Sequence, residues 1–326
     1  MIPLIDMDIL RYEVGSKGQY IDEETGDVVM RNFNYVAECL DQKIREICAL
    51  VWATEEPICF LSMDARTKKR HARRINKKVK RLEKKLEANP LDGAAQQEVK
   101  KLQEEAKYKP NFREAVAKKK EYKVGRKPNS KPLHYDNITE YLLAKYNCVM
   151  AEGLEADDLL SIYQREALAE SKDPTTIICS RDKDLRMVPG MHFGWECGKQ
   201  AQFGPELVSE LGRIKPIYRG KTAKGEPMLA EMKGTGMLFF CVQLITGDSV
   251  DSIPGLPGAG PRAAFNALNN VKTVDEALLA VKGLYAKKFG DKWKEELLEQ
   301  GRLLWMVEKL DDAGKPVMWE IPEVML

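Results

Sequence analysis

The chain has 326 residues, 44% apolar and 8% aromatic, which is enough to bury a sizeable core and suggests two domains or one domain with appendages. No apolar run approaches the roughly 18 residues of a membrane helix, and residues 1–8 reach charge too soon for a signal peptide. We therefore expect a soluble, cytoplasmic protein with no membrane partner. The seven cysteines contain no CxxC pair and lie mostly in apolar stretches, so we expect reduced, buried thiols.

The net charge of +2 conceals a strong asymmetry along the chain. Residues 66–131 contain 24 Lys and Arg against 8 Asp and Glu, a balance of +16, whereas the other residues hold 28 basic and 42 acidic side chains, a balance of −14. A basic arm on an acidic body suggests that the arm holds nucleic acid and the body holds metal ions. The arm is also compatible with a solvated, charged helical hairpin that binds nothing.

Three apolar runs with strand character are each followed by an acidic residue. Residues 2–5 precede Asp6, residues 58–61 precede Asp64, and residues 176–179 precede Asp182. Helical patterns at residues 35–52, 135–146 and 154–169 lie between or beside these runs. Alternating strands and helices predict an α/β fold with a mostly parallel central sheet flanked by helices, in which the three aspartates face one cleft.

The basic arm has the pattern of an inserted helical hairpin. Helices are predicted at residues 72–88 and 94–107, joined by a turn at residues 89–93. Three apolar side chains of the first helix would pack on three of the second: Val79, Leu82 and Leu86 on Val99, Leu102 and Ala106. With its flanks, the insertion spans about residues 66–110 of a first domain, residues 1–202.

A second region, residues 203–326, is predicted to be mainly helical. Residues 213–225 are polar and rich in Gly and Lys, and we expect an exposed loop there. An apolar helix at 237–246 leads into the glycine-rich stretch 247–261, and Pro261 suits the first turn of the next helix. Helices at 262–268, 274–281 and 293–310 and a short strand at 317–321 are expected to complete the chain.

Carboxylates dominate the candidate site. Glu155, Asp157 and Asp158 fall in the first turn of a predicted helix, where acidic residues are favoured in any case. Two more pairs, Asp182 with Asp184 and Asp248 with Asp251, would add to the same cleft. Such a cluster is repulsive unless cations neutralise it, and oxygen ligands favour Mg²⁺ or Mn²⁺. Two such ions would activate water and stabilise a leaving oxygen in phosphodiester hydrolysis. The separated histidines 71, 134 and 192 have no ligand spacing, which disfavours a zinc enzyme.

In this order, the motifs resemble those of the 5′-nuclease superfamily, which comprises flap endonucleases, the 5′-nuclease domain of DNA polymerase I and, most similar here, the short phage exonucleases. The matching stretches are LIDMD at residues 4–8, Asp64, NFR at 111–113, EYKVGR at 121–126, EADD at 155–158, DKD at 182–184, GDSVD at 247–251 and GLPGAG at 255–260. The resemblance implies a PIN-like α/β domain and a C-terminal helix-three-turn-helix region. It covers most of the chain.

The resemblance also implies roles for individual residues. Lys123 and Arg126 would contact the scissile phosphate as catalytic residues. One metal would lie among Asp6, Asp64, Glu155 and Asp157, and a second region would use Asp158, Asp182, Asp184, Asp248 and Asp251. DNA would be held by Arg113, Lys119, Gly255, Gly258, Gly260 and Arg262, with a potassium ion at the glycine loop.

The implied activity is a divalent-metal-dependent 5′→3′ exonuclease on duplex DNA, of the phage replication, recombination or DNA-degradation type. Flap or gap cleavage and RNA–DNA hybrid hydrolysis are compatible with it. The chain departs from the family in the hairpin between Asp64 and Phe112 and in a short 126–132 stretch, which leaves little room for a threading arch. Alternatives are a PIN-type ribonuclease, which normally lacks the glycine loop, and a non-catalytic DNA-binding relative.

Overall fold

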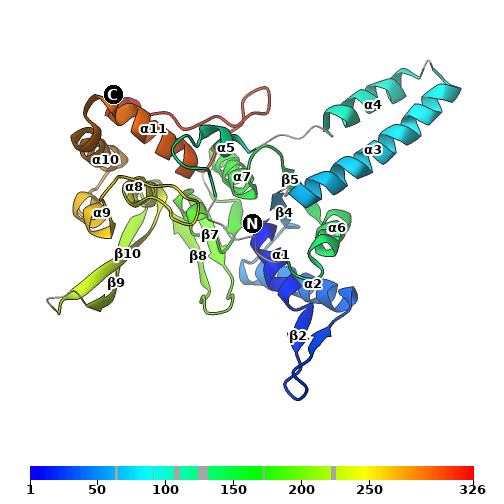
Figure 1. Ribbon diagram of the computed structural model, residues 1–326, viewed down its shortest axis with the longest axis horizontal. Coiled ribbons are helices and arrows are strands. Elements are labelled where there is room, and N and C mark those ends of the chain that lie inside the picture. Colours follow the sequence, from blue (N-terminus) through cyan, green and yellow to red (C-terminus); the bar gives the residue numbers. More distant parts are fainter. Residues whose placement is uncertain (63–64, 91, 106–110, 124–130, 172, 222–224) are drawn as a thin grey trace.

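The computed structural model describes residues 1–62, 65–90, 92–105, 111–123, 131–171, 173–221 and 225–326, with residues 65–74 and 104–105 described as backbone only. Figure 1 shows a central body from which a long helical hairpin and two short strand hairpins project. No described helix combines the length and the apolar character needed to cross a membrane.

The body is built on one six-stranded sheet with the strand order β5-β4-β1-β6-β7-β8. Its strands are β1 (Ile2–Asp6), β4 (Ile58–Ser62), β5 (Asn147–Ala151), β6 (Thr176–Cys179), β7 (Gly190–Gly194) and β8 (Phe203–Val208). All neighbours pair in parallel except β7 and β8, which are antiparallel. The prediction of a mostly parallel central sheet is confirmed, as are the three strands on which it rested.

Helices cover both faces of this sheet, as side-chain alternation along each strand requires. On one face, Ile5, Cys59 and Ile177 pack with α1 (Met7–Ser16), α2 (Phe33–Leu50) and α6 (Tyr135–Lys145). On the other, Leu4, Phe60 and Ile178 pack with α7 (Ala156–Glu170) and the C-terminal helices. The result is a three-layer α/β fold with buried central strands.

The C-terminal helices surround α8 (Gly236–Thr246), which is apolar on every side and buried along residues 236–245. A helix of this kind needs neighbours all round, and they are α9 (Pro261–Leu268), α10 (Val274–Phe289) and α11 (Trp293–Leu304). Their core is continuous with that of the sheet. The strand after the expected boundary at residue 203, β8, also belongs to the main sheet, and the division into two domains stays a prediction.

The inserted hairpin is confirmed as α3 (Ala65–Ala88) and α4 (Gly93–Glu105), which lie side by side in Figure 1. Its own core contains Ile75, Val79, Val99 and Leu102, with Leu82 and Leu86 packed against it. Ala106, expected to join this core, lies outside the described residues. Because these contacts are internal, the hairpin is a small packed unit apart from the main core.

Two predictions about the second half of the chain are wrong. The stretch expected to be an exposed loop begins β9 (Arg213–Lys221), which pairs with β10 (Pro227–Thr235) in an antiparallel hairpin. Buried Leu229 and Met232 provide the apolar face that stabilises it. Residues 317–321 form no strand, although all are described; Trp319 packs instead on Gly301 and Phe240.

The remaining elements were not predicted or differ in extent. A short hairpin, β2 (Gln19–Ile21) with β3 (Val28–Met30), follows α1, and α5 (Phe112–Val116) follows the hairpin insertion. The described residues include three 3-10 turns, η1 (Asp184–Met187), η2 (Gly290–Lys292) and η3 (Glu323–Met325). Relative to expectation, α10 is longer and α11 shorter.

Candidate functional site

The carboxyl end of β1 places Asp6 close to Asp157 and Asp182, at the edge of the site. Asp6 caps α1, since its Oδ1 accepts a hydrogen bond from the Asp8 amide at 2.9 Å, and its Oδ2 accepts one from Ser180 Oγ at 2.7 Å. The Ser180 hydroxyl accepts in turn from the Asp182 amide at 2.9 Å. The ends of the adjacent parallel strands β1 and β6 are thus tied together by hydrogen bonds, as the shared strand direction allows.

The start of α7 brings Glu155 and Asp157 to the same sheet edge. The Ser62 hydroxyl at the end of β4 accepts a hydrogen bond from the Ala156 amide at 2.8 Å, which joins this helix start to the sheet. Asp157 lies close enough to Asp182 and Asp6 for both to raise its pKa. Three separate sheet connections therefore supply carboxylates to one place.

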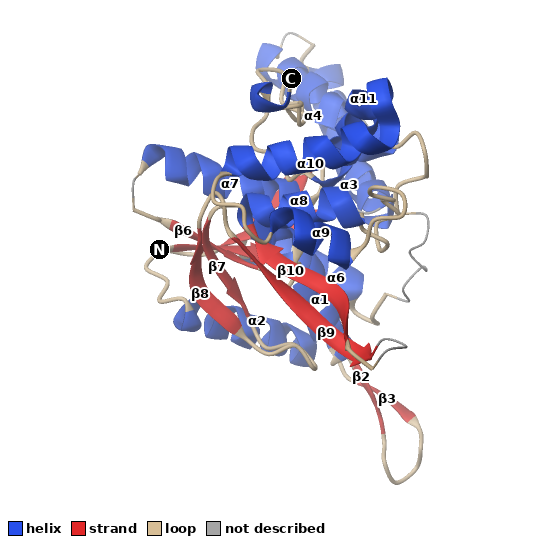
Figure 2. Cartoon of the chain, turned by 90° about the vertical axis from the view of Figure 1, so that its left-hand side faces the viewer, coloured by secondary structure: helices blue, strands red, loops and turns tan. Residues whose placement is uncertain are grey.

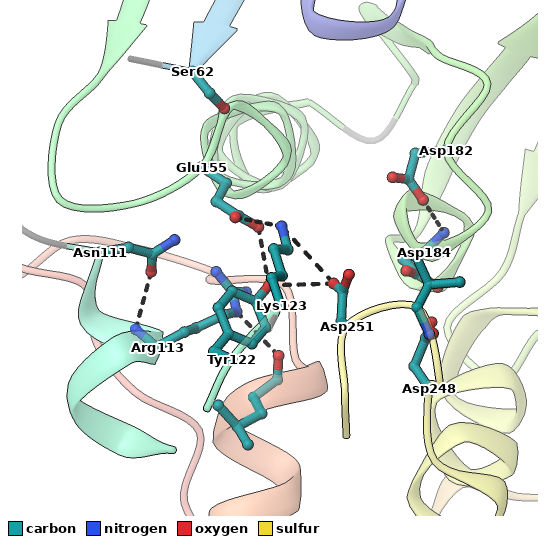
Figure 3. A network of polar contacts seen from close by, with 12 residues as sticks. Ser62, Asn111, Arg113, Tyr122, Lys123, Glu155, Asp182, Asp184, Asp248 and Asp251 are labelled. Carbon is teal, nitrogen blue, oxygen red and sulfur yellow. Dashed lines mark hydrogen bonds and ion pairs between the residues drawn. The ribbon is translucent and has the colours of Figure 1, made fainter. Parts of the chain in front are cut away.

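A dipeptide, Tyr122-Lys123, joins Glu155 to Asp251, as Figure 3 shows. Lys123 Nζ lies 2.5 Å from Glu155 Oε1 and 3.8 Å from Asp251 Oδ2. Tyr122 Oη lies 3.2 Å from Glu155 Oε2 and 3.3 Å from Asp251 Oδ2. The Lys123 amide also donates to the Asp251 carbonyl at 3.0 Å, and Lys123 has a φ of 59°, an uncommon value for a residue with a side chain.

A second lysine, Lys183, bridges the other end of the site. Its Nζ lies 2.6 Å from Asp248 Oδ2 and 3.4 Å from Asp184 Oδ1. Gln243 of α8 holds Asp184 from the other side, donating through Nε2 to Oδ1 at 2.6 Å. Lys123 and Lys183 thus each lie between a different pair of carboxylates.

These groups surround one small cavity of about 20 Å³, roughly the room that a single water molecule needs. Six of the nine predicted metal-site residues line it: Glu155, Asp157, Asp182, Asp184, Asp248 and Asp251. Tyr122 and Lys123 line it too. The expectation that the carboxylates after the strands, at the start of α7 and before the glycine loop converge agrees with this geometry.

Crowding changes the acidity of the carboxyl groups. Burial, with repulsion from Asp8 and Asp182, raises the pKa of Asp6 to about 7. Burial and Asp182 likewise raise the pKa of Asp184 to about 7, and burial with Asp182, Asp6 and Glu155 raises the pKa of Asp157. Asp248 is different: burial would raise its pKa, but the hydrogen bond from Lys183 outweighs it and the pKa is lowered.

The donor set suits a hard divalent cation, because it offers carboxylate oxygens and no histidine or thiol. Within the described part of the chain, however, no three such groups are arranged so that they could hold a metal ion directly. Lys123 and Lys183 supply the compensating positive charge instead. The carboxylate oxygens are therefore suitable ligands for a divalent metal ion, provided that the ammonium groups of Lys123 and Lys183 move away from them.

Two site predictions are corrected by the structure. Arg113, expected to hold DNA, is 2% exposed, and Asp158, expected to serve a metal, is 0% exposed. They form a two-pronged ion pair at 2.6 and 2.8 Å. Arg113 also donates to the carbonyls of Leu303 and Trp305, and Asp158 accepts from the Val307 amide. Arg113 also lines the carboxylate cavity, but both side chains are engaged in joining α5, α7 and the chain after α11, which leaves neither available to DNA or to a metal ion.

The remaining predicted DNA contacts are distributed around the C-terminal helices. Lys119 is ion-paired with Glu296 of α11. Gly255 is structural, since its φ is +65° and an added Cβ would lie 2.2 Å from the Gly247 nitrogen. Gly258 and Gly260 have open space around their Cα atoms, and Arg262 is exposed at the start of α9. These three lie in a helix–loop–helix made of α8 and α9 and stay candidates for DNA contact.

Asp64 and Arg126 lie outside the described residues, and their roles stay predictions. Three residues in the site, Tyr122, Lys183 and Gln243, were assigned no role from the sequence. Tyr122 belongs to the EYKVGR motif and Lys183 to the DKD motif, and this membership is the sequence signal that could have identified them. Gln243 carries no signal of its own, because it is a single polar residue in an apolar helix.

Comparison with known proteins gives no matching family model. DNA polymerase I of Rhizobium leguminosarum is 34% identical over 134 residues, which are 40% of this chain and 11% of that protein. A 5′-3′ exonuclease of Mycobacterium tuberculosis is 26% identical over 195 residues, 53% of this chain and 55% of the relative. Flap endonuclease Xni of Vibrio atlanticus is 26% identical over 194 residues, 58% of this chain and 65% of the relative.

The chain spans less than two thirds of the length of each of these relatives. Among solved structures, a bacteriophage T5 flap endonuclease in complex with DNA and metal ions aligns with 93% of this chain and 88% of its own, at 12% identity and a TM-score of 0.43. The resemblance inferred from the ordered motifs agrees with the names of the sequence relatives. This chain is therefore homologous to proteins named 5′-3′ exonuclease, flap endonuclease and DNA polymerase I.

Proposed function

We propose that this protein hydrolyses phosphodiester bonds of DNA from the 5′ end and requires divalent metal ions. The observation that carries the proposal is the convergence of six carboxylates and Lys123 on one cavity. Such a collection of buried negative charge is costly without cations, and oxygen ligands select Mg²⁺ or Mn²⁺. The names of the sequence relatives support the 5′→3′ polarity.

Asp6, Glu155, Asp157, Asp182, Asp184, Asp248 and Asp251 are the described residues that would hold two metal ions, with Asp64 as a further candidate. Bound there, the ions would supply a water of lowered pKa and stabilise the leaving oxygen. Lys123 is placed to turn from Glu155 and Asp251 toward a phosphate oxygen, where its charge would be strongest against the developing negative charge. Tyr122 keeps the backbone of Lys123 against the Asp251 loop.

The substrate we propose is duplex DNA with a 5′ end, a flap or a gap, and RNA–DNA hybrids are a secondary candidate. Gly258, Gly260 and Arg262 would contact the phosphate backbone at the N-terminus of α9, where main-chain amides favour anions. A potassium ion at this loop is part of the same proposal. We favour exonuclease over flap cleavage, with a role in phage-type replication, recombination or DNA degradation.

The decisive experiment incubates the protein with 5′-labelled and 3′-labelled duplex, flap and hybrid substrates, with Mg²⁺ or with EDTA. An Asp157→Asn, Asp182→Asn double variant should abolish cleavage, whereas Asp275→Asn, Asp291→Asn, two exposed helix-start positions remote from the cavity, should not. We expect metal-dependent release of short products from the 5′ end.

Other outcomes would replace the proposal with a specific alternative. DNA binding without cleavage in Mg²⁺ or Mn²⁺ would indicate a non-catalytic relative in which the acidic cluster has a structural role. Cleavage of RNA alone would indicate a PIN-type ribonuclease.

A further inference from the structure

Two cysteines lie next to each other on the neighbouring strands β4 and β5. Cys59 and Cys148 are direct partners in the parallel pairing of these strands, so both side chains point to the same face of the sheet. That face is covered by α1, α2 and α6, which Figure 2 shows on the side of the sheet away from α7 and α8. All seven cysteines are free thiols in the structure, and none has a part in the proposed function.

The geometry of the pair suits a covalent bond between the two sulfur atoms. Neighbouring strands of a sheet lie about 4.8 Å apart, and disulfides join residues whose Cα atoms are about 4.4–6.8 Å apart. The two thiols already interact, because Cys59 donates a hydrogen bond to the Cys148 sulfur. The Cys148 thiol donates in turn to the Leu142 carbonyl, with 3.3 Å between sulfur and oxygen. A disulfide between Cys59 and Cys148 would therefore need no change in strand pairing.

The two thiols differ in access to solvent and in acidity. Cys148 is partly buried, whereas Cys59 is 0% exposed. The hydrogen bond from Cys59 lowers the pKa of the Cys148 thiol, burial acts against it, and the positive charge of Arg11 adds to the lowering. The pKa of Cys59 is raised, because Cys59 donates that hydrogen bond and is buried. Since the thiolate is the reactive form of cysteine, a reagent from solvent should react first with Cys148.

The cysteine pair also lies where the basic arm leaves the sheet and where the chain rejoins it. The chain continues from β4 into α3, and it returns through α6 to β5. A bond between Cys59 and Cys148 would close a loop that contains the α3–α4 hairpin and Lys123. A cross-link that closes a long loop restricts the unfolded chain, so this bond should stabilise the folded protein.

We propose that Cys59 and Cys148 form a reactive dithiol site that hydrogen peroxide oxidises to a disulfide. The Cys148 sulfur attacks one peroxide oxygen, the O–O bond breaks, and the other oxygen leaves as water with the Cys148 thiol proton. The Cys59 sulfur then attacks the sulfur of the Cys148 sulfenic acid, the S–O bond breaks, and a second water leaves with the Cys59 proton. Two electrons pass from the thiols to the peroxide, and an added dithiol reverses the oxidation. This chemistry is independent of the proposed nuclease function.

The test counts thiols in the folded protein rather than measuring cleavage. The reduced protein is treated with hydrogen peroxide in EDTA, the reaction is stopped with catalase, and the free thiols are titrated in urea. A second portion is digested without reductant for mass spectrometry. We expect two of the seven thiols to be lost and to be recovered with dithiothreitol, and we expect a linked pair of peptides that contains Cys59 and Cys148.

Single-cysteine variants separate the roles of the two thiols. Cys148→Ser should abolish the loss of thiols, because Cys59 has no access to solvent. Cys59→Ser should leave Cys148 as a sulfenic acid, which dimedone labels. The matched control is Cys197→Ser, which removes another partly buried thiol and should still lose two thiols. If a variant does not fold, the linked peptides of the wild-type protein still decide the question.

The melting temperature tests whether the bond fits the folded strands. Oxidation should raise it in the wild-type protein and in Cys197→Ser but not in Cys59→Ser, and a fall in the cross-linked protein would show that the bond distorts the sheet. Three other results would overturn the proposal: retention of all seven thiols, oxidation of Cys148 to the sulfinic acid without a link, or a link from Cys148 to Cys48 of α2 instead of Cys59.

Discussion

Lys123 and Lys183 each bridge two carboxylates of the candidate site, but they differ in what we expect of them. Lys123→Ala should lower turnover by about 100-fold or more, because its charge acts where negative charge develops on the phosphate. DNA affinity should fall only a few-fold. Single-turnover cleavage and equilibrium binding, with Lys120→Ala as the control at an exposed neighbour, would separate the two. Equal losses in rate and binding would contradict a catalytic role.

Lys183 is expected to compete with metal. Its ammonium group sits between Asp184 and Asp248, so a metal ion must displace it. Lys183→Met should therefore bind Mg²⁺ or Mn²⁺ more tightly in calorimetric titrations, while its melting temperature in EDTA should fall. Weaker metal binding by the variant would show that Lys183 helps to hold the ion instead.

The Arg113–Asp158 pair is expected to be structural. Asp158→Asn leaves a buried guanidinium without its counter-charge, and breaking such a pair costs about 3–5 kcal/mol. Urea unfolding should show this loss equally with and without Mg²⁺. If Asp158 were a metal ligand, the loss would appear mainly as reduced metal affinity with stability in EDTA preserved.

At the scale of elements, the basic hairpin of α3 and α4 is the clearest candidate for sequence-independent DNA contact. Its core residues lie on the inner face, which leaves basic side chains of α3 exposed, and five of these are Lys77, Lys78, Arg81, Lys84 and Lys85. Changing these five to Gln should weaken duplex binding and lower its salt slope by up to about 4.5. The control is Lys309→Gln, Lys315→Gln, which removes two exposed lysines outside the hairpin. An unaltered salt slope in the five-residue variant would mean that the hairpin does not contact DNA.

The contrast between α3–α4 and β9–β10 explains what the sequence could predict. In the helical hairpin, Val79, Leu82 and Leu86 recur at helical spacing among charged residues, so the helical periodicity can be recognised from the sequence. In β9, the apolar and polar residues alternate only briefly among Lys and Gly residues, so the strand pattern is weak. The strand is stabilised by its partner β10, whose Leu229 and Met232 are buried only in the folded protein.

The site shows the same limit. The motifs predicted which carboxylates converge, because strand ends share an edge of the sheet. They could not distinguish Asp157 from Asp158, one residue apart, because that difference depends on the position of Arg113, distant in sequence. Spacing identifies the type of residue at a site, whereas burial and partners decide its role.

For the whole molecule, the crowded carboxylates predict that stability depends on pH and metal together. The pKa values of Asp6 and Asp184 are about 7 when folded, above the ordinary value of 3.8. The folded protein therefore holds protons that the unfolded chain has released, so stability should fall as pH rises from about 4 through 7.

Melting temperatures in EDTA across this range would measure the fall. Saturating Mg²⁺ should reverse it at the upper end, since an ion that binds only the folded state stabilises it. Asp6→Asn, Asp184→Asn, which mimics the protonated pair, should show a flatter profile. A profile that rises with pH in EDTA would mean that the carboxylates are not held in their neutral forms.

The main core joins residues that lie about 300 positions apart in the sequence. Leu4 of the central strand shares a cluster with Trp305, Trp319 and Met325, and the carbonyls of Leu303 and Trp305 complete the partners of Arg113. On the ribosome, the surroundings of β1 are complete only after the residues that follow α11 have been made. A chain that ends before α11 would lack residues that line the carboxylate cavity, so the proposed nuclease activity should appear only after translation has passed α11.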